Sequence, residues 1–327
     1  MREKSRLKIL ICLLTFVGFL AQGEARTVNV AVPTLNMVVI AFTAAKEKGY
    51  YQEEGLEVEI IWMSAPVAAQ ALIGGNVEFS TVSGAALPAI LRGAPLRFLF
   101  TTYNRPMFWL YAKPEISDIK GLRGKKVAVS GIGSGPAHLL IEILKKYGLE
   151  GGRDVALLGL GVQPNQYAAL LSGSVDAAMM APPYNVMLKE AGFYELVSFL
   201  KEDFVELQGS IIIRQELLRS DPALVERFVR GTLKGFRYAR ENRSGTIPIL
   251  VRYQKLREEL AAKYYDLVRP IMTLDGTASE ELQKKFLDFG TVRLGLKESP
   301  PLQRVFDYSL TRRINGQLEA AGWKPEK

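Results

Sequence analysis

The residue types that most often carry out chemistry in proteins are scarce in this sequence of 327 residues. It contains one cysteine, Cys12, and one histidine, His138. An intrachain disulfide, a cysteine metal site and a histidine cluster are therefore all excluded. We expect His138 to have a structural or cleft-lining role. The sequence predicts a protein without catalytic residues, without a metal site and without a cofactor.

A glycine-rich segment, Gly131-Ile132-Gly133-Ser134-Gly135-Pro136, lies between a predicted strand and a predicted helix. It does not fit the dinucleotide-binding pattern, because Pro136 occupies the position of the third glycine, and it lacks the Gly-Lys-Ser/Thr of a P-loop. The remaining interpretation is that the segment starts a helix. The free backbone N–H groups of a helix start are a favourable place for an anion. Ser134 is then either a ligand contact or only the helix cap, and we favour the ligand contact.

Two carboxylates, Glu78 and Asp176, lie at the ends of similar octapeptides, residues 71–78 and 169–176. Each octapeptide reads as a helix end, a glycine-bearing turn and an acidic residue that opens a buried strand. One copy in each of two similar lobes would place the carboxylates far apart. We therefore expect both to have a structural role rather than to form a catalytic pair.

The elements around these residues alternate between strand-like and helix-like patterns, which predicts an α/β fold with mixed sheets flanked by helices. After residue 214 the pattern is helical, and we expect these helices to pack on the first lobe. The predicted domains are a first lobe of residues 26–112 plus 215–327 and a second lobe of residues 113–214, joined by two hinge crossovers. The predicted strands are 27–32, 56–61, 78–82, 96–102, 126–130, 155–160 and 176–180, and the predicted helices between them are 37–48, 65–73, 85–91, 136–147, 165–171 and 183–190.

Residues 1–25 have the pattern of a secretory signal peptide: four basic residues, then an apolar run from Ile9 to Leu20, then small residues. The apolar run is too short to span a membrane. The formal net charge of +8 raises the question of nucleic acid, but lysine and arginine are interleaved with glutamate along the helices. Such interleaving is typical of a solvated surface and argues against a nucleic-acid partner.

Several segments of the sequence follow the order and spacing that are typical of one protein family. The segments are 44–56, 71–79, 122–129, Gly133-Ser134-Gly135, and 171–177 followed by Pro182-Pro183-Tyr184. In this order they resemble the substrate-binding proteins of ABC importers for nitrate, taurine, aliphatic sulfonates and thiamine-pyrimidine precursors. The resemblance covers residues 27 to about 215. At Ala85, Pro136 and Ala181 the chain departs from the pattern of several sulfonate binders, which argues against a sulfonate ligand.

The resemblance implies a two-lobed periplasmic-binding-protein fold, a periplasmic location and a monomer that delivers a small molecule, anionic or heterocyclic, to a permease and its ATPase. It places the ligand in the cleft between the lobes, where open α/β sheets bind ligands. Two alternatives stay open: an enzyme on the same fold, such as a chorismate dehydratase or a pyrimidine synthase, and a ligand-sensing domain. The implied ligand contacts are Leu35, Asn36, Ser83, Gly84, Tyr103, Asn104, Ser134, Pro183, Tyr184, Gln208 and Gly209.

Overall fold

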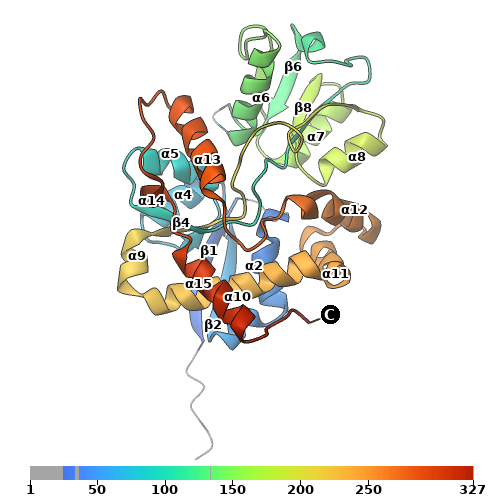
Figure 1. Ribbon diagram of the computed structural model, residues 1–327. Coiled ribbons are helices and arrows are strands. Elements are labelled where there is room, and N and C mark those ends of the chain that lie inside the picture. The colour runs from blue at the N-terminus through green and yellow to red at the C-terminus, as the bar shows by residue number, and fades with distance from the viewer. Residues whose placement is uncertain (1–24, 34–36, 133, 327) are drawn as a thin grey trace, which may run out of the picture.

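The computed structural model describes residues 25–33, 37–132 and 134–326. The chain forms two lobes, each built around a five-stranded mixed sheet with helices on its faces (Figure 1). The predicted α/β fold class is thereby confirmed. The predicted signal peptide lies outside the described residues, except for Ala25.

The first sheet has the strand order β2-β1-β3-β10-β4. Strand β1 runs parallel to both β2 and β3, whereas β10 is inserted antiparallel between β3 and β4. The strands are β1 (Arg26–Val32), β2 (Leu56–Trp62), β3 (Phe79–Ser80), β4 (Leu96–Phe100) and β10 (Ile211–Arg214), and the helices between them are η1 (Met37–Val39), α2 (Ile40–Glu47), α3 (Tyr50–Glu53), α4 (Ala65–Ile73) and α5 (Ser83–Leu91).

The second sheet repeats this arrangement in the order β7-β6-β8-β5-β9, with β5 antiparallel between β8 and β9. Its strands are β5 (Trp109–Ala112), β6 (Lys126–Val129), β7 (Ala156–Gly159), β8 (Ala177–Met180) and β9 (Tyr194–Ser198), and its helices are η2 (Lys120–Leu122), α6 (Gly135–Lys146), α7 (Gln163–Leu171) and α8 (Tyr184–Glu190). The two lobes therefore share one topology, as the repeated octapeptides indicate.

The two repeated carboxylates lie at equivalent places in these sheets. Glu78 Oε2 accepts a hydrogen bond of 2.8 Å from the backbone N–H of Asn29, at β1. Asp176 Oδ2 accepts one of 2.9 Å from the backbone N–H of Lys126, at β6. Each carboxylate thus ties the start of one strand to its parallel neighbour, which is the structural role expected of them.

Strands β5 and β10 are exchanged between the lobes. Strand β5 directly follows the first lobe in sequence but lies in the second sheet, and β10 lies in the first sheet. The chain therefore crosses between lobes at residues 101–108 and 199–210. The predicted lobe boundaries, after residues 112 and 214, coincide with the ends of these two strands.

The two crossing segments bind each other as a short ribbon. Tyr103 and Gln208 exchange two backbone hydrogen bonds, each of 3.0 Å, and the backbone N–H of Phe199 donates to the carbonyl of Phe108 at 3.1 Å. A third segment joins them, since the N–H of Thr273 donates to the carbonyl of Thr102 at 2.8 Å. The lobes are thus joined by a hydrogen-bonded hinge.

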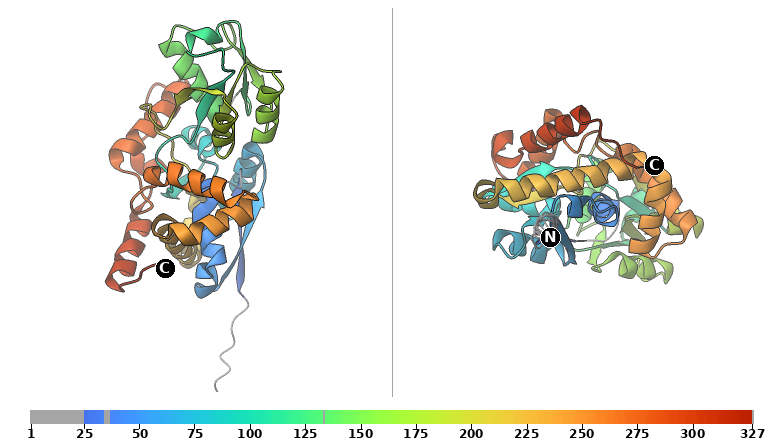
Figure 2. Two further views of the ribbon diagram at one scale, coloured as in Figure 1. Left: turned by 90° about the vertical axis from the view of Figure 1, so that its right-hand side faces the viewer. Right: turned by 90° about the horizontal axis from the view of Figure 1, so that it is seen from below.

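The C-terminal helices pack on the first lobe, as predicted. Helix α10 lies directly against α2, because a side-chain carbon at Gly235 would lie 2.2 Å from the carbonyl oxygen of Ala41. Figure 2 shows α10 crossing the base of this lobe. The Phe228 ring of α10 stacks on Phe79 of β3 at 3.8 Å, which joins helix and sheet in one core. These helices are α9 (Gln215–Ser220), α10 (Pro222–Glu241), α11 (Arg243–Gln254), α12 (Glu258–Val268), η3 (Arg269–Ile271), α13 (Glu280–Arg293), α14 (Leu302–Val305) and α15 (Ser309–Ala320).

Within the described ranges, no helix has both the length and the apolar character that crossing a membrane requires.

Candidate functional site

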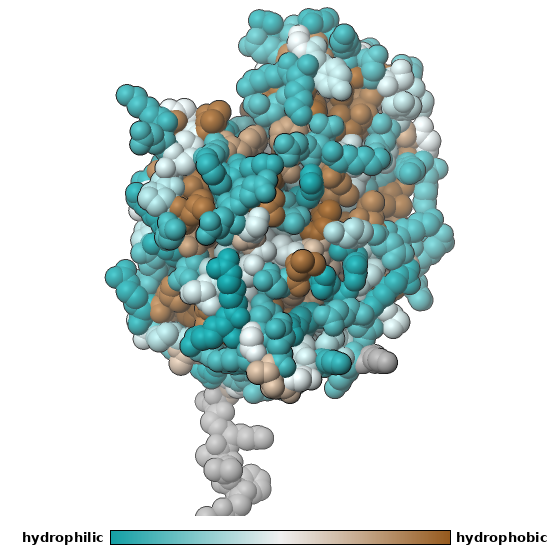
Figure 3. All heavy atoms as spheres, viewed as in Figure 1, coloured by the Kyte–Doolittle hydropathy of each residue, from teal (hydrophilic) through white to brown (hydrophobic). Residues whose placement is uncertain are grey.

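The loops that follow the parallel strands of the two sheets meet between the lobes. Helices α5 and α6 begin there, and Gly84 and Gly135 from their first turns line the same pocket. Figure 3 shows apolar residues gathered where the two lobes face each other. The crossing segment and helix α13 complete the pocket wall. The lining residues are Gly84, Leu87, Gly135, Leu139, Val205, Glu206, Phe286, Phe289, Gly290 and Arg293.

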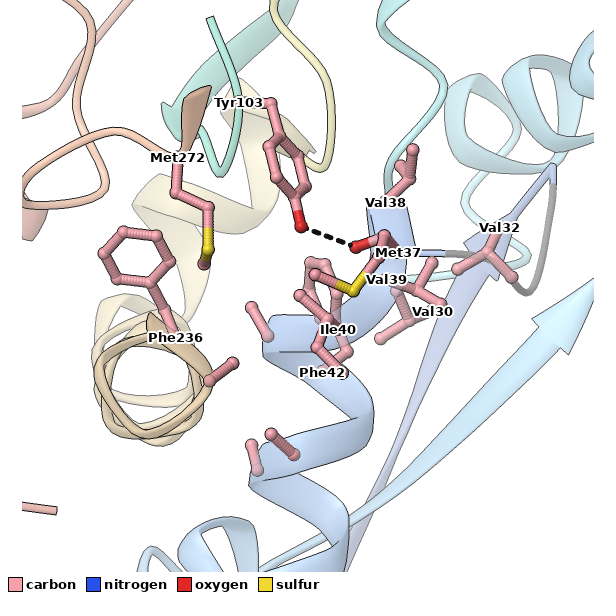
Figure 4. Packing of buried hydrophobic residues seen from close by; sticks show 14 of the residues in the cluster. Val30, Val32, Met37, Val38, Val39, Ile40, Phe42, Tyr103, Phe236 and Met272 are labelled. Atoms are coloured by element: carbon pink, nitrogen blue, oxygen red, sulfur yellow. Dashed lines mark hydrogen bonds between the residues drawn. The ribbon is translucent and has the colours of Figure 1, made fainter. Parts of the chain in front are cut away.

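Tyr103 lies inside the hinge rather than on an open wall of the cleft. Its side chain is 0% exposed, and its hydroxyl donates a hydrogen bond of 3.1 Å to the carbonyl of Met37 (Figure 4). The hydroxyl of Tyr264 accepts a bond of 2.9 Å from the N–H of the same Met37. Burial raises the pKa of Tyr103 well above its usual range, so the hydroxyl keeps its proton and remains a donor. Two tyrosines thus fix the start of η1.

Three other hinge residues were predicted as ligand contacts. Two of them make contacts within the hinge, and the third has an unpaired polar atom. Gly209 has a φ of +63°, and a side-chain carbon there would lie 2.5 Å from the carbonyl of Val38, so only glycine fits. Asn104 is partly buried and donates its N–H to the carbonyl of Ile271 at 3.4 Å. Gln208, by contrast, leaves its buried side-chain oxygen without a hydrogen-bond partner among the described residues.

The helix starts provide the next predicted contacts. Ser83 is buried, and its hydroxyl has no partner in the described part of the chain, whereas Gly84 beside it is exposed. The Ser134 hydroxyl accepts a hydrogen bond of 3.4 Å from the N–H of Ala137 and therefore caps α6. Leu35 and Asn36 lie outside the described residues.

The second lobe contributes Pro183 and Tyr184. The bond between Pro182 and Pro183 is cis, and α8 begins directly after it. The Tyr184 ring lies 5.3 Å from the ring of Tyr167 on α7, and burial raises the pKa of Tyr184. This aromatic pair stands at the carboxyl ends of β7 and β8, on the side that faces the first lobe.

One polar residue of the pocket, Glu206, was missed by the sequence analysis. Its Oε2 atom is buried without a partner among the described residues. Burial raises the pKa of Glu206 to about 7, against the lowering effects of Gln208 and of the Arg293 charge. The only sequence signal was an acidic residue between the apolar Val205 and Leu207.

Several unpaired polar atoms lie on the hinge or near the helix starts that follow the parallel strands. Of eight buried side-chain atoms without a hydrogen-bond partner among the described residues, six lie on the crossing segment, in the loop after β3, or in the first turns of α5, α7 and α8. One of them, on Glu206, belongs to the pocket lining. Buried polar groups are normally paired, so these atoms indicate a place where another molecule supplies the partners. The described residues hold no group of three or more acidic, histidine or cysteine side chains that could bind a metal ion. The six atoms belong to Thr81, Ser83, Gln166, Asn185, Glu206 and Gln208.

The curated proteins that the chain resembles include both a binding protein and an enzyme. It is 28% identical to the riboflavin-binding protein RibY of Chloroflexus aurantiacus over 223 residues, which cover 63% of each protein. It is 29% identical to the 4-amino-5-hydroxymethyl-2-methylpyrimidine phosphate synthase of Schizosaccharomyces pombe over 140 residues, 41% of this chain and 39% of the synthase. The match thus spans less than two thirds of the length of either relative.

Among solved structures, the aliphatic sulphonate binding protein SsuA of Escherichia coli superposes with a TM-score of 0.67. The match covers 85% of this chain and 91% of SsuA at 18% identity, so it demonstrates a shared periplasmic-binding-protein fold. Residues 36–244 match the profile of the family described as NMT1/THI5 like. Since this match covers more than half of the sequence, the chain belongs to the NMT1/THI5-like family.

Proposed function

We propose that this protein is the exported solute-binding component of an ABC importer, which captures a small organic molecule between its lobes and delivers it to a membrane permease. The observation that carries the proposal is the set of six unpaired buried oxygens, because they come from both lobes and from the hinge. A molecule that pairs with all three regions binds best when the two lobes are close together. It therefore favours a closed arrangement of the lobes over an open one.

The ligand in this proposal occupies the space between the first turns of α5, α6 and α8. Ser83 and Gly84 approach it from the first lobe, Ser134, Pro183 and Tyr184 from the second, and Gln208 from the hinge. Tyr103, Asn104 and Gly209 hold the hinge in the shape that this contact needs. Leu35 and Asn36 complete the proposed contacts.

Contacts outside the hinge are consistent with a closing motion. Lys263 of α12 forms an ion pair of 2.8 Å with Glu190 of α8, across the two lobes. On the opposite side, the Phe289 ring of α13 lies 6.2 Å from Phe204 in the crossing segment. The ion pair lies on helix surfaces and can separate when the ribbon of crossing segments bends. Capture and release then require no rearrangement within either sheet.

Partners and location follow from this role. A binding protein of this type works outside the inner membrane as a monomer and docks on a permease that is driven by an ATPase. The likeness to RibY extends over more of the chain than the likeness to the pyrimidine phosphate synthase, which supports binding over catalysis. The enzyme alternative is favoured by such shorter matches to pyrimidine phosphate synthases and by a fold shared with the desulfurization enzyme DSZB.

The experiment uses full-length protein purified under native conditions. Mass spectrometry identifies any molecule that copurifies, and calorimetry measures the affinity for riboflavin, 4-amino-5-hydroxymethyl-2-methylpyrimidine and ethanesulfonate. We expect a bound molecule to raise the melting temperature and to reduce the radius of gyration in X-ray scattering, and to be recovered unchanged. Recovery of a converted product would contradict the proposal in favour of an enzyme.

A further inference from the structure

The unpaired buried atoms of the described residues have one chemical character. All eight are oxygens, and none is a nitrogen. Of the six on the hinge and near the helix starts, the two on Thr81 and Ser83 are hydroxyls, which both donate and accept. The other four are acceptors when Glu206 is ionised: Gln166 Oε1, Asn185 Oδ1, Glu206 Oε2 and Gln208 Oε1.

A neighbouring bond fixes the orientation of one of these amides. The Gln166 Nε2 atom donates to the carbonyl of Gly161 at 2.8 Å, so its oxygen is the free atom. The Glu206 carboxylate has no nitrogen that could take the place of its free oxygen. These two oxygens therefore do not depend on a choice between amide oxygen and nitrogen.

Glu206 also occupies the place where the sequence suggested a bound anion. A side-chain carbon at Gly135, in the first turn of α6, would lie 3.3 Å from Glu206 Oε1. The positive end of α6 thus already faces a carboxylate of the protein itself. Arg293 lines the same pocket from α13, with Arg92 near it, but Arg293 forms no ion pair within 4 Å among the described residues.

An oxyanion is a poor complement to this pocket. A sulfonate or nitrate brings only acceptors, so it can pair with Arg293 of the pocket lining but leaves Glu206 and the amide oxygens unpaired and adds a negative charge beside Glu206. A group with N–H donors pairs with the same oxygens. A protonated or amino-substituted nitrogen compound also gains from the carboxylate charge.

We propose that Glu206 and Gln208 form an acceptor subsite that binds N–H groups of the ligand and selects nitrogen-bearing molecules over oxyanions. The proposal rests on the cleft being the ligand site and names the chemical class that the cleft takes. Glu206 then contacts the ligand directly, and Gln208 adds a second acceptor from the same crossing segment.

The test compares Glu206→Gln with Glu202→Gln, a matched change in the same crossing segment whose carboxylate instead pairs with Lys146 on the surface at 3.2 Å. Calorimetry at pH 8 uses 4-amino-5-hydroxymethyl-2-methylpyrimidine as the N–H probe and ethanesulfonate as the oxyanion probe. We expect the wild type to bind the aminopyrimidine and not ethanesulfonate. Glu206→Gln should weaken the aminopyrimidine at least tenfold, while Glu202→Gln leaves its affinity unchanged.

Two results overturn the subsite: binding of ethanesulfonate but not of the aminopyrimidine, or an aminopyrimidine affinity that Glu206→Gln does not change. A second test needs no ligand. Glu206→Gln should raise the melting temperature of the unliganded protein at pH 8. An unchanged melting temperature from pH 5 to pH 8 also overturns it, because no unpaired carboxylate is then buried. Conversion of the bound aminopyrimidine into a product would contradict the proposed binding function but not the subsite.

Discussion

The carboxylates of the sheets and the carboxylate of the cleft differ in how they are paired. Glu78 and Asp176 each accept a backbone N–H from a neighbouring parallel strand, and Asp176 also pairs with Lys113 at 2.9 Å. Glu206 has one oxygen without any partner among the described residues. Burial acts to raise the pKa of Asp176, but the bonds from Lys113 and Lys126 outweigh it and lower that pKa overall, whereas the pKa of Glu206 rises to about 7. The paired carboxylates stabilise the fold. Burying the unpaired carboxylate costs folding free energy, and a bound ligand that pairs with it removes this cost.

The largest effect that this comparison predicts is a gain of stability in Glu206→Gln. The folded pKa of about 7 lies above the unfolded value of 4.5, so folding binds the proton more tightly and wild-type stability falls as the pH rises through this window. The substitution removes that loss, which amounts to at most about 3 kcal/mol above pH 7. Urea denaturation at pH 5 and pH 8 measures it, and we expect the gain at pH 8 to shrink strongly at pH 5. A destabilised variant at pH 8 would show that Glu206 is structurally paired like the other two.

The second effect has the opposite sign. Asp176→Ala removes the acceptor for the Lys126 N–H and the partner of Lys113, and we expect it to lower the free energy of unfolding by about 2 kcal/mol at pH 7. Because the folded pKa of Asp176 is lowered, its contribution is present above the unfolded value of 3.8 and is lost as the pH falls below it. Denaturation curves of wild type and variant should therefore converge in acid. Curves that stay equally far apart at low pH would assign the loss to packing instead.

The third prediction sharpens the comparison within the sheets. Glu78 accepts the N–H of Asn29 but forms no ion pair within 4 Å in the described chain, so Glu78→Ala should cost about 1 kcal/mol, less than Asp176→Ala. The same denaturation experiment at pH 7 measures both variants. Equal losses would mean that the Lys113 ion pair adds nothing measurable, as is common for exposed pairs.

Sequence patterns predicted the parallel part of each sheet well. The predicted helix 65–73 coincides with α4, and β1, β2, β6 and β8 lie within two residues of their predicted bounds. The antiparallel strands β5, β9 and β10 were missed. All of Trp109–Ala112 and nearly all of Ile211–Arg214 are buried. Neither strand therefore alternates between apolar and polar residues, and a run of four residues is too short to show a clear period. Their place in the opposite sheet depends on pairing with strands far away in the sequence.

The candidate site was harder to predict than the fold. The family resemblance pointed to residues just after the strands, and Ser83, Gly84 and Ser134 do lie at the helix starts that face the cleft. It could not indicate that Tyr103 is enclosed within the hinge, because this depends on contacts with Met37 and with the distant α12. Glu206 has no counterpart in the repeat, and its burial is created by α6 and α13 together. Sequence spacing predicts which edge of a sheet carries a site, whereas unpaired atoms require the folded contacts.

The smallest effect concerns Ser134, which we expect both to cap a helix and to contact the ligand. Its oxygen accepts the Ala137 N–H at 3.4 Å, at the long end of hydrogen-bond distances, so Ser134→Ala should cost only about 0.5 kcal/mol of stability. The hydroxyl proton is still available to a ligand, and we expect the affinity for 4-amino-5-hydroxymethyl-2-methylpyrimidine to fall several-fold as well. Ser279→Ala is the matched control, because Ser279 caps α13 in the same way, with an oxygen 3.3 Å from the Leu282 N–H. If both variants lose the same stability and neither loses affinity, Ser134 is only a cap, and the polar contacts of the cleft come from Ser83, Glu206 and Gln208.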